Sequence, residues 1–145
     1  MKKIIISHSP EETKKLGRKL AANLKAGDVI SLIGELGTGK TVLSQGIAAG
    51  AGVRQNVTSA SFVLIQKFQG KLPFYHLDFY RLSENEINES GFEEIFDSGG
   101  ICVIEWAQKN SKILPVQTIM IKIKFLNSFS RQLIFEGRAG KLKGI

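Results

Sequence analysis

The sequence predicts an α/β fold in which a central mixed β-sheet carries helices on both faces and a C-terminal antiparallel hairpin. Residues 29–33 form a nearly unbroken apolar run, and residues 101–104 form another, as is typical of strands covered on both faces. Residues 118–125 and 132–136 instead alternate apolar with polar side chains, which indicates a hairpin with one face in water. The length of 145 residues fits a single domain spanning 1–145.

The first predicted elements are a short strand at residues 4–6 and a helix that begins at Ser9. Ser9 is a good N-cap residue, Pro10 suits the first turn, and Glu12 is placed to close a capping box. Gly27 marks the predicted stop of this helix. The apolar residues that share one face of the helix are Leu16, Leu20, Ala21 and Leu24.

A β-hairpin and an acidic helical stretch are predicted for the middle of the chain. Residues 62–68 and 72–77 have the composition of strands and are joined at Gly70-Lys71. The acidic stretch follows and continues through Phe96. Residues 97–100 then form a turn that leads into the second apolar run.

The composition is that of a globular protein of the reducing cytoplasm. Hydrophobic residues make up 43% and charged residues 23% of the chain. Residues 1–6 begin with basic side chains, but the apolar run is too short for a signal peptide, and nothing approaches a membrane span. Cys102, the single cysteine, lies in the second apolar run and is predicted to be a buried thiol. We therefore expect a cytoplasmic protein without a membrane partner.

The net charge of +7 is concentrated at the C-terminal end. Basic and acidic residues balance over residues 1–108, whereas residues 109–145 contain 8 basic residues and Glu136 as their only acid. Residues 83–106 contain seven acids and no Lys or Arg. This polarity suits an electrostatically steered partner or contact with RNA. The alternative is that these are solvated faces, with a basic tail that balances the acidic stretch within the fold.

A glycine-rich turn follows the first apolar run and has the form G-x-x-x-x-G-K-[ST] at residues 34–41. Its glycines let backbone N–H groups wrap a phosphate chain, and the next helix directs its positive N-terminal end at the same anion. Lys40 would reach the β- and γ-phosphates, and the Thr41 hydroxyl would bind Mg²⁺. We therefore predict a P-loop NTPase fold. The predicted nucleotide-binding residues are Gly34, Glu35, Leu36, Gly37, Thr38, Gly39, Lys40, Thr41 and Val42.

We call residues 34–41 the P-loop. Downstream of it, two predicted strands each end in a carboxylate residue. Glu105 follows the second apolar run, where a carboxylate can order Mg²⁺-bound water or act as a base, and Asp78 is a candidate second acid beside the metal. We predict Lys40, Asp78 and Glu105 as catalytic, and Thr41, Asp78 and Glu105 as metal ligands. The alternatives are an ordinary strand-end acid for Glu105 and a helix cap or a partner of Arg81 for Asp78.

Neighbouring residues admit structural as well as catalytic roles. His76 alone is more often a packed or hydrogen-bonded histidine than a catalyst, and Trp106 is first a core or near-surface aromatic. Arg81 could stabilise developing phosphate charge or form an exposed salt bridge. The D-x-x-G sequence at 97–100 precedes a strand instead of following one, and N-K-x-D is absent, which favours ATP over GTP. A small-molecule kinase is the competing enzyme class, although no arginine-rich lid is evident.

The P-loop, Ser59–Phe62, the H-L-D-F-Y-R sequence at 76–81 and Glu105-Trp106 occur in the order and spacing of the bacterial TsaE (YjeE) ATPases, which this chain resembles. The resemblance implies a partner-stimulated Mg²⁺-dependent ATPase that acts with TsaD and TsaB in threonylcarbamoyladenosine modification of tRNA. ATP hydrolysis would then switch or reset that complex. An ATP-binding interaction module with negligible turnover is the alternative. The basic segment 109–145 could contact tRNA, or tRNA could be reached only indirectly.

The resemblance also implies a switch that responds to the nucleotide. The residues assigned to it are Ser59, Ser61, Phe62, His76, Tyr80, Arg81 and Trp106. The family's usual S-P-T-F sequence is Ser-Ala-Ser-Phe in this chain, so Ala60 stands where a rigid proline is common. Gln108 replaces a common acid after Glu105-Trp106, and Val42 replaces a second hydroxyl after Lys40. None of these departures removes a group that the chemistry requires.

Overall fold

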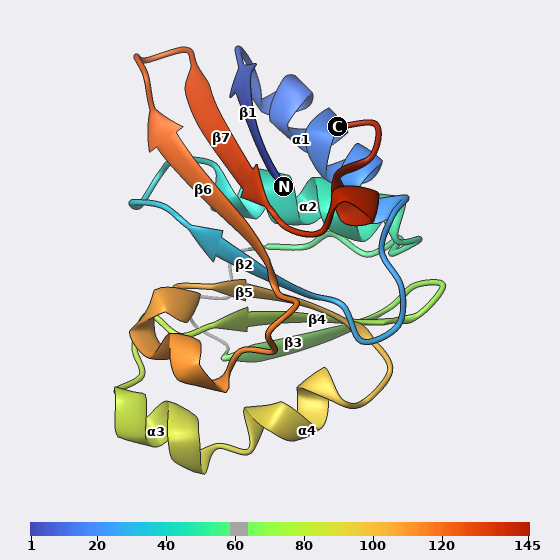
Figure 1. Ribbon diagram of the computed structural model, residues 1–145, viewed down its shortest axis with the longest axis vertical. Helices are drawn as coiled ribbons and strands as arrows, with labels where there is room; N and C mark the ends of the chain where they lie inside the picture. The colour runs from blue at the N-terminus through green and yellow to red at the C-terminus, as the bar shows by residue number, and fades with distance from the viewer. Residues whose placement is uncertain (59–63) are drawn as a thin grey trace.

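The computed structural model describes residues 1–58 and 64–145, and within them the chain forms one seven-stranded sheet (Figure 1). The order of strands across the sheet is β1-β7-β6-β2-β5-β4-β3. The strands are β1 (Lys2–Ser7), β2 (Val29–Ile33), β3 (Ile65–Gln69), β4 (Pro73–Asp78), β5 (Ile101–Glu105), β6 (Ile119–Phe125) and β7 (Arg131–Glu136). The helices are α1 (Pro10–Ala21), α2 (Lys40–Gly50), α3 (Glu84–Glu89), α4 (Phe92–Phe96), η1 (Ala107–Ile113) and η2 (Ala139–Leu142).

The sheet is mixed, as predicted. Strands β4, β5, β2 and β6 run parallel to one another, whereas β1–β7, β7–β6 and β3–β4 are antiparallel pairs. The C-terminal hairpin is β6–β7, and the predicted hairpin in the middle of the chain is β3–β4. The part of that first strand that falls on residues 62 and 63 lies outside the described residues.

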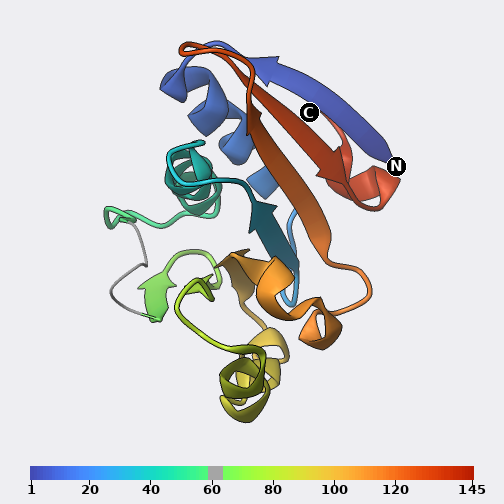
Figure 2. The ribbon, with the colours of Figure 1, turned by 90° about the vertical axis from the view of Figure 1, so that its left-hand side faces the viewer.

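Helices cover both faces of the central strands, so this prediction is confirmed (Figure 2). Helices α1 and α2 lie side by side on one face, where Ile30, Leu32 and Val103 point into the larger core. Helices α3, α4 and η1 lie on the opposite face over Val29 and Cys102. Alternate residues of β2 and β5 therefore enter two different cores, which explains why both strands are apolar throughout. Among the described residues no helix is long and apolar enough to cross a membrane.

The first helix differs from the prediction at both ends. The Ser9 side chain accepts a hydrogen bond from the Glu12 N–H, but the Glu12 carboxylate accepts from the His8 N–H (2.7 Å) instead of closing a capping box on Ser9. The helix also ends at Ala21, well before Gly27. Beyond it, the Asn23 side chain donates hydrogen bonds to two carbonyls near the C-terminus, which draws the chain away from the helix axis. Tertiary contacts therefore override the local pattern.

The acidic stretch is helical, as predicted, and divides at Gly91 into two helices, α3 and α4. Gly91 has φ 70°, a left-handed conformation that interrupts helical hydrogen bonding. Downstream, Cys102 is buried as predicted, and burial raises the pKa of its thiol well above its ordinary value.

The chain termini pack together beside α1. The Lys3 ammonium donates to the carbonyls of Leu142 (2.8 Å) and Ile145 (3.0 Å). Lys141 forms an ion pair with Asp28, with its Nζ 2.6 Å from a carboxylate oxygen. This lysine of the basic C-terminal segment is therefore paired within the fold, although its partner lies outside the acidic stretch of residues 83–106.

Candidate functional site

The P-loop connects the end of β2 to the start of α2, and two of its glycines are required by the geometry. A Cβ atom at Gly34 would lie 2.6 Å from the Thr38 hydroxyl and 2.9 Å from the Ile123 carbonyl. Gly39, the N-cap of α2, has φ 106°, which L side chains rarely adopt. These glycines let the loop turn tightly enough to present the N-terminus of α2 and its free N–H groups at the sheet edge.

Lys40 is the first residue of α2, and its side chain folds back into the loop. Its Nζ donates a 2.6 Å hydrogen bond to the Gly34 carbonyl and lies 4.0 Å from the centroid of the Trp106 ring. The residue is only 5% exposed. Burial lowers the pKa of the Lys40 ammonium, and the negative charges of Glu105 and Asp78 oppose that shift. A buried cation held in this way is ready to receive an anion.

Asp78 and Glu105 end the neighbouring parallel strands β4 and β5, where they are directly paired in register. Both residues are about 5% exposed or less. One oxygen of Asp78 accepts a 2.9 Å hydrogen bond from the Tyr80 N–H. Burial raises the pKa of the Asp78 carboxyl, the Tyr80 hydrogen bond acts in the opposite direction, and the charge of Glu105 adds to the increase.

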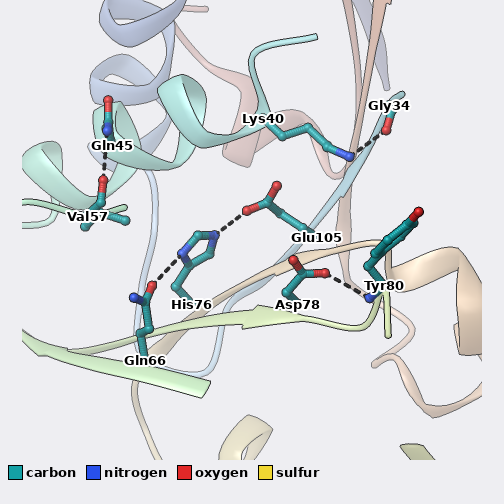
Figure 3. A network of polar contacts seen from close by, with 9 residues as sticks. All are labelled: Gly34, Lys40, Gln45, Val57, Gln66, His76, Asp78, Tyr80 and Glu105. Atoms are coloured by element: carbon teal, nitrogen blue, oxygen red, sulfur yellow. Dashed lines mark hydrogen bonds and ion pairs between the residues drawn. The ribbon is translucent and has the colours of Figure 1, made fainter. Parts of the chain in front are cut away.

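His76 lies beneath these carboxylates and is fully buried (Figure 3). Its Nε2 is 2.7 Å from an oxygen of Glu105, and its Nδ1 is 3.2 Å from the side-chain oxygen of Gln66. Glu105 belongs to β5, His76 to β4 and Gln66 to β3, so the two contacts connect three adjacent strands. His76 is thus hydrogen-bonded, as the structural reading of the sequence proposed.

The predicted catalytic residues line one cavity of about 330 Å³, which we call the carboxylate cavity. Its walls are Leu36, Gly37, Gly39, Lys40, Thr41, Val42, Asp78, Glu105 and Trp106. The cavity lies at the carboxyl ends of parallel strands, where open α/β sheets bind their ligands. Glu35 is exposed, while Thr38 is buried and donates its hydroxyl proton to the Glu35 carbonyl (2.8 Å), which supports the loop from within.

Trp106 joins the site through a strained backbone conformation. Its φ of 61° is the only positive value at a non-glycine residue among those described. This conformation places its ring against Lys40 and 4.8 Å from the ring of Tyr80. Of the other residues assigned to the switch, Arg81 is exposed, and Ser59, Ser61 and Phe62 lie outside the described residues, as does Ala60. The switch therefore stays a prediction.

A second cavity, of about 320 Å³, shares P-loop residues with the first and was not predicted. We call it the neighbouring cavity. Its lining includes His8 just before α1, Pro10 and Thr13 in the first turns of α1, and Phe129 and Arg131 from the β6–β7 hairpin. The Arg131 Nε also donates to the Thr38 carbonyl (3.2 Å), which braces the loop. Ninety-three positions separate these two residues, so no local sequence pattern signals their contact.

The donors of the carboxylate cavity fit a magnesium ion. The Thr41 hydroxyl and the carboxylates of Asp78 and Glu105 are oxygen ligands, which Mg²⁺ prefers. The described residues contain no group of three or more His, Cys, Asp or Glu side chains placed to hold a metal. Mg²⁺ retains several waters and shares phosphate oxygens with a substrate, so one hydroxyl and two carboxylates are enough protein ligands for it. The predicted metal ligands remain a prediction.

Parallel central strands in a mixed sheet, a glycine-rich loop between β2 and α2, and a lysine and two carboxylates at the same sheet edge define a P-loop NTPase-type protein. Comparison with known proteins narrows the class. The family described as "Threonylcarbamoyl adenosine biosynthesis protein TsaE" matches residues 7–133. The chain belongs to the TsaE family.

Individual relatives support this assignment. The chain is 40% identical over 128 residues to the tRNA threonylcarbamoyladenosine biosynthesis protein TsaE of Bacillus subtilis, covering 88% of this chain and 80% of that protein. It is 34% identical to the TsaE protein of Treponema pallidum, with 88% of this chain and 96% of that protein covered. The crystal structure of Bacillus subtilis YdiB superposes with a TM-score of 0.81 at 33% identity, covering 99% of this chain and 90% of the other.

Proposed function

We propose that this chain is a Mg²⁺-dependent ATPase that acts with TsaD- and TsaB-type proteins in threonylcarbamoyladenosine modification of tRNA. Its hydrolysis of ATP switches or resets that complex and is stimulated by the partners. Family membership and the names of the relatives support the pathway. The cytoplasm stays our predicted location.

The convergence of one lysine, one hydroxyl and two carboxylates on a single cavity carries this proposal. Lys40 and Thr41 come from the P-loop, and Asp78 and Glu105 end the two adjacent strands. Binding a triphosphate needs only the loop, the lysine and the helix N-terminus. Hydrolysing it also needs an acid beside the metal and a group that orients the attacking water. The second pair of residues supplies groups of that chemistry.

We assign each residue the role that its position supports. The P-loop N–H groups and Lys40 bind the phosphates, and Lys40 exchanges its bond with the Gly34 carbonyl for the phosphate oxygens. Thr41 and Asp78 would hold Mg²⁺, which when bound neutralises charge on the phosphate oxygens. Glu105 orients the attacking water and accepts its proton. Trp106 covers the ammonium and limits its access to solvent.

The neighbouring cavity gives the nucleoside a place beside the phosphates. Gly37, Gly39 and Val42 line both cavities, so a ligand whose phosphates occupy the loop can extend directly into the second one. His8 and the Phe129 ring provide flat surfaces there. Since an adenine base stacks well on such groups, we assign the neighbouring cavity to the base and ribose.

Phosphate release by the purified chain, alone and with TsaB and TsaD, tests the proposal. We expect slow turnover alone, a clear increase when both partners are present, and loss of turnover in Glu105→Ala with nucleotide binding retained. Nucleotide binding without turnover under any condition would support the interaction module instead. Phosphorylation of a metabolite in the absence of partners would make the protein a kinase.

A further inference from the structure

We propose that His76 and Gln66 are positioning residues that hold the Glu105 carboxylate in its working orientation. The inference rests on the proposed function, because it concerns the same turnover, but neither residue lines the carboxylate cavity. Together they form a hydrogen-bonded chain, Gln66–His76–Glu105, that runs across three strands and ends at the proposed catalytic carboxylate.

The geometry of the sheet places the three side chains in line. Gln66 and His76 are direct partners in the antiparallel β3–β4 ladder, so their side chains share a face of the sheet. On the other side of His76, the Glu105 oxygen lies 2.7 Å from Nε2. His76 has no exposed surface, and Glu105 is 5% exposed. Packing therefore fixes the ring, and the short contact fixes the carboxylate relative to it.

Hydrogen-bond chemistry sets the direction of the contact. A carboxylate accepts only, so the Nε2 of His76 carries the hydrogen and donates to Glu105. At the other nitrogen, Gln66 can serve either ring form, because its side-chain amide has both an acceptor and a donor group. If the ring also carries hydrogen at Nδ1, the amide oxygen accepts it; if not, the amide nitrogen donates to Nδ1. Gln66 thus supports an Nε2–H donor in both cases.

This contact holds one oxygen of Glu105 apart from a competing partner. Lys40 is the cation whose field acts on Glu105 in the same cavity, and an ion pair between them would occupy both groups. One oxygen of Glu105 is held by His76, while the other points to the side of the site where Lys40 lies (Figure 3). Removing the Nε2–H donor releases the carboxylate to rotate toward Lys40. The water-orienting geometry would be lost while the phosphate-binding loop stays intact.

Kinetics of four variants, measured with the partner proteins, test this inference. Loss of a hydrogen-bond partner behind a metal-site ligand typically reduces activity by about 10–100-fold, and Glu105 is a predicted ligand, so we expect a fall of about that size in kcat for His76→Leu. We expect a smaller fall for Gln66→Leu, and unchanged KM and nucleotide Kd for both. His76→Gln returns an N–H donor near the Nε2 position and should restore most of the kcat. Gln69→Leu is the matched control for Gln66→Leu, because Gln69 lies at an exposed position of β3, and its kinetics should equal those of the wild type.

The outcomes separate the inference from the proposed function. Wild-type turnover with unchanged kcat in His76→Leu and Gln66→Leu would overturn the positioning role alone. Equal losses in His76→Leu and His76→Gln, with lower melting temperatures in both, would assign His76 to structure only and also overturn it. Absence of turnover in the wild type would overturn the proposed function itself, and the inference with it. In a Glu105→Gln background, His76→Leu should cause no further loss of kcat.

Discussion

The two ends of this sheet use charge in opposite ways. At the end that contains β5, β4 and β3, strands β4 and β5 are covered on both faces, yet they end in the buried carboxylates Asp78 and Glu105, next to the buried Lys40. At the other end, four of the six charged residues of β1, β7 and β6 lie on the face away from α1 and α2, where they are exposed or half-buried. Those residues are Lys2, Lys122, Lys124 and Glu136.

This difference shows which part of the sheet is built for a ligand. Transfer of an ionised group out of water is unfavourable unless it is paired and hydrogen-bonded. Lys40 and Asp78 carry part of this unfavourable free energy. Burial lowers the pKa of Lys40 and raises the pKa of Asp78, and each shift favours the neutral form of the side chain. The antiparallel end avoids it by leaving charges in water, or by using them to anchor the C-terminus, as Lys3 does with the carbonyls of Leu142 and Ile145. The predictions below test that contrast.

The largest effect is expected for the buried cation. Lys40→Ala should weaken nucleotide binding about 100-fold, because charge-assisted hydrogen bonds contribute about 1.5–3 kcal/mol each and about 1.4 kcal/mol corresponds to tenfold in Kd. Isothermal titration with an ATP analogue measures the change. Lys2→Ala, at an exposed position of β1, serves as the control and should bind like the wild type. Equal affinities for the two variants would refute the assigned role of the P-loop.

Two aspartates are expected to change stability in opposite directions. The raised pKa of Asp78 means that its contribution to stability is present below the ordinary value of 3.8 and is lost as the pH rises through the raised value. At pH 7 the ionised group therefore destabilises the nucleotide-free protein. Asp78→Asn should raise the melting temperature at pH 7, lose that advantage as the pH falls toward 4, and reduce ATP turnover.

Asp28→Asn should instead lower the melting temperature by about 2–4 °C at pH 7, since an ion pair with this geometry contributes up to about 1 kcal/mol. Its carboxylate accepts from the Lys141 ammonium at 2.6 Å and from the Lys25 N–H at 2.7 Å. ATP turnover should stay unchanged, because Asp28 lies outside both cavities of the site. Thermal unfolding monitored over a range of pH checks both variants. A lower melting temperature of Asp78→Asn at pH 7 would contradict the claim that the buried charge of Asp78 destabilises the nucleotide-free protein.

Two lysines near the C-terminus sharpen the same comparison at a smaller scale. Lys141 is paired, whereas the Lys143 side chain is exposed. Lys141→Ala should reduce the free energy of unfolding by about 0.5–1 kcal/mol, and Lys143→Ala should change it by less than about 0.5 kcal/mol. Urea denaturation resolves the difference. If partner or tRNA binding responds only to Lys143→Ala, the exposed lysine has a role in recognition.

The smallest effect at neutral pH concerns the buried thiol of β5, because this effect appears only at alkaline pH. Burial raises the pKa of Cys102, so its contribution to stability is present below the ordinary value of 9.0 and is lost as the pH rises above it. The unfolded chain then loses a proton that the folded chain retains, which lowers stability by at most about 1.4 kcal/mol per pH unit. Urea denaturation between pH 8 and 10 should show this extra decline in the wild type and not in Cys102→Ala. Parallel curves for the two proteins would contradict it.

Local patterns were sufficient to predict the strands, the P-loop and the coverage of β2 and β5 on both faces. Each of these patterns depends only on residues that are close in the sequence, as in the apolar runs of β2 and β5. Long-range contacts decided the rest. Helix α1 ends at Ala21 because Asn23 bonds to the C-terminal segment, and Glu12 bonds to His8 instead of Ser9.

The candidate site shows the same division. Lys40, Asp78 and Glu105 were predicted because each follows or ends a recognisable strand, and the structure brings them to one cavity. Arg131 and the neighbouring cavity were missed, because the β6–β7 hairpin reaches the P-loop only in three dimensions. The positions of the side chains around Glu105, including its bond to His76, also require the register of three strands.

The most direct test of the account compares two glutamates, one from each end of the sheet. Glu105→Gln and Glu136→Gln each remove one negative charge at the end of a strand. The nucleotide Kd and the single-turnover rate of ATP hydrolysis are measured for both with the partner proteins present. The account predicts that Glu105→Gln lowers the rate by about 100-fold or more with Kd nearly unchanged, and that Glu136→Gln behaves like the wild type. Wild-type turnover in Glu105→Gln would contradict it.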